Sequence, residues 1–202
     1  MIVAKRKPKP VADGRTFDSL DEVEFYWWCV EAREFGLLES FRCQSPCFTL
    51  SHAVTVEQER FGKTGNPIAS RQKTLLREAT YTADFQLSFS VPDMAADCGF
   101  HDVNDQPFLV DVKPAFDRDQ SRERKFSVLQ KWVYQCEGAY VHPVVPVEFF
   151  AKMWCPEKAR FTPTGKVRNS ARYNDLPTLK NWLQKIANKC EKMHSAELNK
   201  LP

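Results

Sequence analysis

Apolar positions after residue 18 recur every three or four residues, which predicts an amphipathic helix. Ser19 is a favoured N-cap residue, and Glu22 follows three positions later, as in a capping box. Gly36 is suited to end this helix near Phe35. Trp28 lies off the apolar face, so we expect it to be exposed or to contact a partner. The apolar face consists of Val23, Tyr26, Trp27 and Val30.

Strand patterns follow this helix. The segment from Phe41 to Leu50 predicts a strand that includes Gln44, and the segment from Ala53 to Glu59 predicts a strand that pairs with it. Glycine, asparagine and proline residues predict a loop from Arg60 to Ser70. From Leu75 to Ser90, apolar and polar residues alternate, as expected of a half-buried strand.

The second half of the chain predicts a β-α-β unit. After a polar linker at 91–106, the segment from Pro107 to Lys113 predicts a buried strand that ends at Pro114. Residues 121–137 predict a helix, and the segment from Ala139 to Val147 predicts a strand, which implies a partly parallel sheet. The apolar face of the predicted helix consists of Phe126, Leu129, Trp132, Val133 and Cys136.

Together these elements predict an α/β fold with a mixed central β-sheet flanked by helices. A last helix, from about Pro177 to Met193, carries an apolar stripe among lysines. We divide the chain into a basic flexible arm at 1–14, a core at 15–150, and a basic, partly helical C-terminal extension at 151–202.

Composition narrows the class of protein. The chain has 202 residues, of which 43% are hydrophobic and 27% charged, as in ordinary globular domains. No apolar run approaches the roughly 20 residues of a membrane span, so we expect no membrane contact and a cytoplasmic location. Seven cysteines at irregular spacing predict reduced thiols rather than a disulfide framework. Cys43-x3-Cys47 with His52 lacks the second half of a zinc site, although zinc remains an alternative.

The formal net charge of +3 is divided unevenly along the chain. Residues 151–202 contain 11 Lys and Arg against 4 Asp and Glu, whereas residues 1–150 contain 18 against 22. This asymmetry suggests a polyanionic partner for the C-terminal part, and a solvated basic face is the alternative.

Three charged residues interrupt apolar strand patterns. Asp111 and Lys113 are two positions apart on a predicted strand, so their side chains project from the same face. Buried charges in such a strand need partners or a metal ion. Asp84 interrupts the apolar pattern of another strand. Carboxylates that converge at strand ends provide the hard oxygen ligands that Mg²⁺ prefers.

These residues suit the hydrolysis of a phosphodiester bond. Asp84 and Asp111 would hold the metal, and the Val112 carbonyl could supply another oxygen. Lys113 would orient or deprotonate the attacking water and offset charge on the phosphate. Glu22 would complete the metal site or position a metal-bound water. Glu24 is a rival that lies on another face of the same helix, and Glu22 could instead serve only as the capping partner of Ser19.

The order of these motifs resembles the PD-(D/E)xK nuclease superfamily. The chain contains F-D-S-x-x-E at 17–22, Y-T-A-D-F at 81–85 and V-D-V-K at 110–113. It is similar in these segments to phage-type junction-resolving endonucleases and to transposon-end endonucleases, whose Q-P segment is roughly matched by Gln44-Ser45-Pro46. The resemblance covers Phe17 to Val147. It departs from the family at Ala83, where proline is common, and at Asp111, where glutamate is commoner.

The resemblance implies a restriction-endonuclease-like core and the catalytic residues Glu22, Asp84, Asp111 and Lys113. It implies a Mg²⁺-dependent DNA endonuclease, with Mn²⁺ as a substitute. We expect a phage or mobile-element enzyme that acts on branched or specific DNA, as a homodimer or with partner subunits. The alternatives are a nuclease subunit of a transposition or packaging complex, and an inactive DNA- or protein-binding module of the same fold.

Basic residues after the Asp-x-Lys strand are candidates for DNA contact. For each of them, a solvated helix face is the alternative. They are Arg118, Arg122, Arg124, Lys125 and Lys131.

Overall fold

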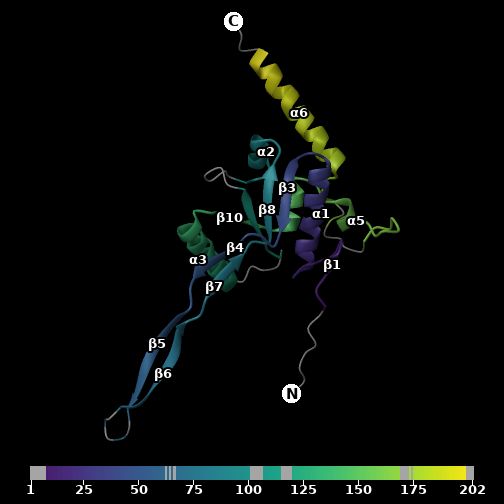
Figure 1. Ribbon diagram of the computed structural model, residues 1–202. Coiled ribbons are helices and arrows are strands. Elements are labelled where there is room, and N and C mark those ends of the chain that lie inside the picture. Colours follow the sequence, from purple (N-terminus) through teal and green to yellow (C-terminus); the bar gives the residue numbers. More distant parts are fainter. Residues whose placement is uncertain are drawn as a thin grey trace.

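A four-stranded mixed sheet lies at the centre of an α/β structure (Figure 1). The computed structural model describes residues 8–61, 63, 65, 67–100, 107–114, 120–168, 173 and 175–198. Strands β9 and β10 are parallel and the other neighbours antiparallel, so the predicted mixed sheet and β-α-β unit are confirmed. In sheet order the strands are β10 (Val141–Val144), β9 (Phe108–Val112), β8 (Phe85–Phe89) and β3 (Leu38–Cys43).

One long antiparallel hairpin supplies two strands of this sheet and then leaves it. After the β3–β8 pair, β4 (Cys47–Ser51) pairs with β7 (Ala79–Thr82). Farther out, β5 (Val54–Phe61) pairs with β6 (Pro67–Leu76). Figure 1 shows β5 and β6 projecting away from the rest of the molecule. We call β4, β5, β6 and β7 together the ribbon.

Helix α1 (Leu20–Glu34) packs against β3 and forms as predicted. The side chain of its N-cap, Ser19, accepts a hydrogen bond from the backbone N–H of Glu22. Helices α4 (Pro146–Lys152) and α5 (Glu157–Arg160) also contact α1. The helix is therefore covered on more than one side.

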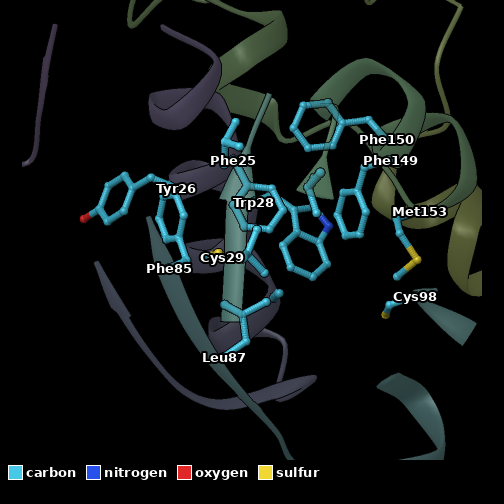
Figure 2. Packing of buried hydrophobic residues seen from close by; sticks show 14 of the residues in the cluster. Phe25, Tyr26, Trp28, Cys29, Phe85, Leu87, Cys98, Phe149, Phe150 and Met153 are labelled. Atoms are coloured by element: carbon cyan, nitrogen blue, oxygen red, sulfur yellow. The ribbon is translucent and has the colours of Figure 1, made fainter. Parts of the chain in front are cut away.

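Helix α4 and the residues after it bury Trp28, so the prediction that this side chain is exposed or contacts a partner is wrong. Its ring is fully buried and lies 4.7 Å from Phe149 and 5.3 Å from Trp154, measured between centroids (Figure 2). Trp27 and Val30 of the predicted apolar face are only partly buried, whereas Phe25, which lies off that face, packs against Phe85 of β8 with 5.0 Å between ring centroids. The helical pattern did not reveal that residues after 145 would cover the adjacent face.

Residues of the predicted C-terminal extension share this core. Met153, Trp154, Tyr173 and Trp182 belong to the same buried cluster as α1. Trp182 lies on α6 (Leu179–Leu198), the predicted last helix, whose first turns pack against that cluster. Among the described residues, no helix is both long and apolar enough to cross a membrane.

Helix α3 (Gln120–Glu137) follows β9 and packs against β4 and β10. Val133 is buried with Leu109 of β9 and Val141 of β10 in a second cluster. Trp132 remains 37% exposed, so its predicted place on the apolar face is wrong. The buried stripe of α3 is narrower than the apolar pattern suggested.

Several predicted boundaries are also wrong. The strand predicted at 41–50 is split at 44–46 into β3 and β4, and β5 pairs with β6 rather than with this strand. The predicted loop at 60–70 is shorter, because β6 begins at Pro67. The predicted linker at 91–106 contains α2 (Pro92–Asp97), and its residues 101–106 lie outside the described part.

The described part of the N-terminal segment is structured. β1 (Val11–Ala12) pairs with β2 (Arg15–Thr16), and Ala12 lies in the core. The basic arm predicted at 1–14 is therefore too long at its C-terminal end. Its residues 1–7 lie outside the described part of the chain.

We predict that Trp28→Ala lowers the free energy of unfolding by about 3–5 kcal/mol, because it removes a large buried ring from a packed aromatic cluster. Trp132→Ala is the matched control and should cost about 1 kcal/mol or less, because that ring is partly exposed. Urea unfolding followed by circular dichroism measures both. Equal costs would contradict the described packing of α1.

Candidate metal centre

The site is built at the break in the long hairpin, between the central sheet and the ribbon. The N–H of Gln44 donates to the carbonyl of Asp84 at 2.7 Å, and the N–H of Ala83 donates to the carbonyl of Pro46 at 3.2 Å. Gln44 has a φ of 51°, in the left-handed region. Irregular positions of this kind redirect side chains in β-structure. Here the break places Asp84 between β7 and β8.

Strand β9 brings Asp111 beside this break. Val110 and Val112 lie in the core cluster that contains α1, whereas Leu109 lies in the cluster that contains α3. By alternation along the strand, Asp111 shares the α3 side with Leu109. Asp111 is only 9% exposed, so its charge requires nearby partners.

Three contacts hold the two aspartates. The backbone N–H of Val112 donates to Oδ2 of Asp84 at 2.7 Å. The hydroxyl of Tyr81 donates to Oδ2 of Asp111 at 3.3 Å, and Nζ of Lys113 lies 2.9 Å from Oδ1 of Asp111. The predicted projection of Asp111 and Lys113 from one face is therefore confirmed.

Lys113 has a second neighbour on α3. Its Nζ lies 4.3 Å from the centroid of the Phe126 ring. A cation near an aromatic face is stabilised electrostatically. The ammonium is thus held between a carboxylate and a ring while its side chain stays 34% exposed, so it can still meet a ligand from solvent.

Glu22 reaches the same region from the first turn of α1. Its Oε1 accepts from the Ser19 hydroxyl at 2.8 Å, and its Oε2 accepts from the N–H of Asp18 at 3.1 Å. The carboxylate is therefore a capping partner, as the alternative interpretation holds. It is also close enough to Asp111 and Asp84 for its charge to affect them.

Burial and like charges disfavour ionisation in this group. Burial, then the charge of Asp111, raise the pKa of Asp84 to about 8, although the Val112 N–H opposes the shift. Burial also raises the pKa of Glu22. Burial and the two aspartates together raise the pKa of Tyr81, so its hydroxyl stays protonated as a donor.

The carboxylates of the site offer only a partial set of metal ligands. Within the described part of the chain, no group of three or more His, Cys, Asp and Glu side chains is arranged to hold a metal. The zinc alternative at Cys43, Cys47 and His52 therefore gains no support. The charge of the Asp84–Asp111 pair nevertheless suits a divalent cation. A cation would offset the repulsion between the two carboxylates, which now favours protonation of Asp84. The oxygens of the pair are of the kind Mg²⁺ prefers.

Two further residues were predicted as possible contributors to the metal site, Val112 and Glu24. Val112 contributes its N–H to Asp84, and a metal contact by its carbonyl stays a prediction. Glu24, the rival to Glu22, is buried and accepts from the hydroxyl of Tyr173. It is therefore engaged elsewhere in the core.

The predicted DNA-contact residues are described unequally. Arg124, Lys125 and Lys131 are exposed on α3. Arg122 lies in α3, but its side chain is outside the described part, as is the whole of Arg118. Their role in DNA contact stays a prediction.

Tyr81 is the site residue that sequence reasoning missed. It lies in the Y-T-A-D-F segment at 81–85, in which the resemblance implies a role only for Asp84. Asp84 lies three positions later, so alternation along one strand would have placed the two on opposite faces. The break at Ala83–Asp84 changes that relation and directs both side chains toward β9.

We predict that Asp84→Asn stabilises the metal-free protein, because it removes one of two repelling carboxylates and keeps an acceptor for Val112. The pKa of Asp84 is raised from 3.8 to about 8, so the folded state binds this proton more tightly than the unfolded state. Wild-type stability is then lost as pH rises from about 4 toward about 8, and the variant should gain about 2 kcal/mol or more across that range. Urea unfolding in EDTA at several pH values measures the difference. A difference that does not change with pH would contradict the buried acidic pair.

The chain was compared with protein-family models, with curated proteins and with solved structures, and none of the three comparisons found a match.

Proposed function

We propose that the protein is a Mg²⁺-dependent DNA endonuclease with a restriction-endonuclease-like core and a PD-(D/E)xK-type site. The observation that carries this proposal is the convergence of Asp84 and Asp111 with Lys113 at the end of β9, where the sheet meets the ribbon. The buried Asp111 and the half-buried Asp84, beside a lysine, weaken the fold unless they serve a ligand. A structural ion pair would need only one of the two acids.

The chain's own residues can each be given a part in hydrolysis. A bound Mg²⁺ supplies a Lewis acid for the scissile phosphate. Asp84 and Asp111 would hold it, with Asp84 oriented by the Val112 N–H and Asp111 by Tyr81. Lys113 would orient a water for attack and offset the negative charge that builds on the phosphate.

The bond changes are those of a simple hydrolysis. The water oxygen gives up one proton to solvent and bonds to phosphorus while the bond from phosphorus to the leaving oxygen breaks, and the leaving oxygen takes up one proton from solvent in return. The charge of Glu22 acts on Asp84 and would add to the attraction for a cation. We propose it as a supporting ligand through water rather than a direct one, because both its oxygens already accept hydrogen bonds.

The substrate is proposed to be duplex DNA that is branched or has a specific sequence, as in phage or mobile-element enzymes. The alternatives are a nuclease subunit that requires partners and a module of the same fold that binds without cutting. These alternatives differ in whether the isolated protein turns over substrate. Cleavage assays therefore separate them.

We predict that the wild-type protein cuts supercoiled plasmid or a four-way junction with Mg²⁺ or Mn²⁺ and not with EDTA. Asp111→Ala and Lys113→Ala should lower the rate by at least about 100-fold, because they remove a metal ligand and the charge beside the phosphate. Asp175→Ala and Lys152→Ala alter exposed residues of the same types and serve as controls.

The result that supports the proposal is metal-dependent cutting that both site variants lose while remaining folded by circular dichroism. Preference between plasmid and junction then identifies the class of substrate. Retained cutting in both variants would overturn the assignment of the site. No cutting by wild type under any metal would favour the partner-dependent or binding-only alternatives.

We predict that Tyr81→Phe lowers kcat by about 10-fold and raises the Mg²⁺ concentration needed for half-maximal rate. The substitution keeps the ring but removes the donor that orients Asp111, and such supporting contacts typically contribute this much. Tyr134→Phe, on an exposed side chain, is the matched control. A merely structural role for Tyr81 would change unfolding midpoints without changing the metal requirement.

A further inference from the structure

Strands β5 and β6 form the outer part of the ribbon, and their described residues do not contribute to the buried core clusters. Every residue of β5 is exposed, as are residues 70–76 of β6. Figure 1 shows this pair of strands extending well beyond the central sheet. The ribbon begins beside the candidate metal centre, because β7 carries Tyr81 and leads directly into Asp84.

The strand register separates charge between the two faces of β5–β6. Directly paired residues place their side chains on the same face, and successive residues alternate between faces. One face therefore combines the pairs Val56–Lys73 and Gln58–Arg71 with Arg60. The irregularities of register lie only at the ends, between 54 and 55 and between 60 and 61, so the alternation holds between them.

The opposite face is acidic. It combines Thr55 with Thr74, Glu57 with Gln72, and Glu59 with Ser70. The basic face thus has three positive charges and no acid among these residues, and the acidic face has two negative charges and no base. A ribbon that is charged only for solubility would mix the signs on both faces. Separation by face indicates a polyanion on one side.

The dimensions of the ribbon suit duplex DNA. From the Phe48–Tyr81 pair to the Gln58–Arg71 pair, the chain advances ten residues, or at most about 33 Å. One turn of duplex DNA is about 34 Å long. A two-stranded ribbon also fits the major groove, which is about 12 Å wide.

We propose that the basic face of β5–β6, formed by Arg60, Arg71 and Lys73, binds the phosphate backbone of duplex DNA about one helical turn from the metal centre. This inference rests on the proposed nuclease function for the position of the DNA. It also requires that the substrate has duplex DNA beside the cleavage site, which the proposed function alone does not require. Free ends and short single strands would not reach this face.

The test compares Arg60→Ala/Arg71→Ala/Lys73→Ala with Thr55→Ala/Gln72→Ala/Thr74→Ala, which alters the opposite face of the same strands. Fluorescence anisotropy measures binding to duplexes of about 12 and about 30 base pairs in EDTA, over a range of salt, so that no cleavage is needed. The basic-face variant should bind the longer duplex about 10- to 100-fold more weakly. The slope of its log binding constant against log salt concentration should fall by the amount expected for about three lost phosphate contacts. The control variant should match wild type.

Loss of binding that is equal on both duplexes, or equal in the control variant, would overturn the inference, because it would reflect net charge or damage to the fold. So would a change of oligomeric state in light scattering, which would make the ribbon a contact between copies of the chain. If wild type cuts DNA and the basic-face variant binds and cuts equally well, the inference fails alone. If wild type neither binds nor cuts, the proposed function fails and the inference fails with it.

Discussion

The close approach of two carboxylates, the buried Asp111 and the half-buried Asp84, is the constraint around which the site is organised. Like charges that are partly removed from water repel strongly, so each must be offset by a donor or a cation. The Val112 N–H, the Tyr81 hydroxyl and the Lys113 ammonium provide three such offsets. They are insufficient to keep Asp84 ionised, since its pKa is raised to about 8. A divalent cation would supply the further positive charge that keeps both carboxylates ionised.

Local patterns predicted the elements that carry this site. The capping residue Ser19 fixed the start of α1, and the spacing of Asp111 and Lys113 fixed their common face. Both inferences need only neighbouring residues, which is why they succeeded. The burial of Trp28 depends instead on Phe149 and Trp154, far away in sequence, and no period within α1 contains that information. The strand predicted at Ala53–Glu59 forms as β5, but its pairing with β6 was missed, because the start of β6 falls in a segment whose composition predicts a loop.

The break in the hairpin explains why the position of Asp84 could be predicted but its surroundings could not. A regular strand would carry Tyr81 and Asp84 on opposite faces. The hydrogen bonds of Gln44 and Ala83 across the break allow both to approach β9. Gln44 therefore has a structural part here, and its side-chain amide donates to the carbonyl of Thr16 at 3.2 Å. In the sequence, only Pro46 marks this break in the hairpin.

The distribution of charge links the ribbon to the site in a way that net charge does not. A formal charge of +3 on 202 residues gives little long-range attraction for DNA, and the candidate metal centre is itself acidic. Phosphates would therefore find little attraction at the metal centre until a cation is present. Further basic residues beside the two aspartates would supply attraction, but they would also weaken the attraction for the cation. Under the proposed function, the position of Arg60, Arg71 and Lys73 on a separate face of the ribbon would avoid this conflict, because they would attract the flanking duplex without neutralising the proposed metal ligands.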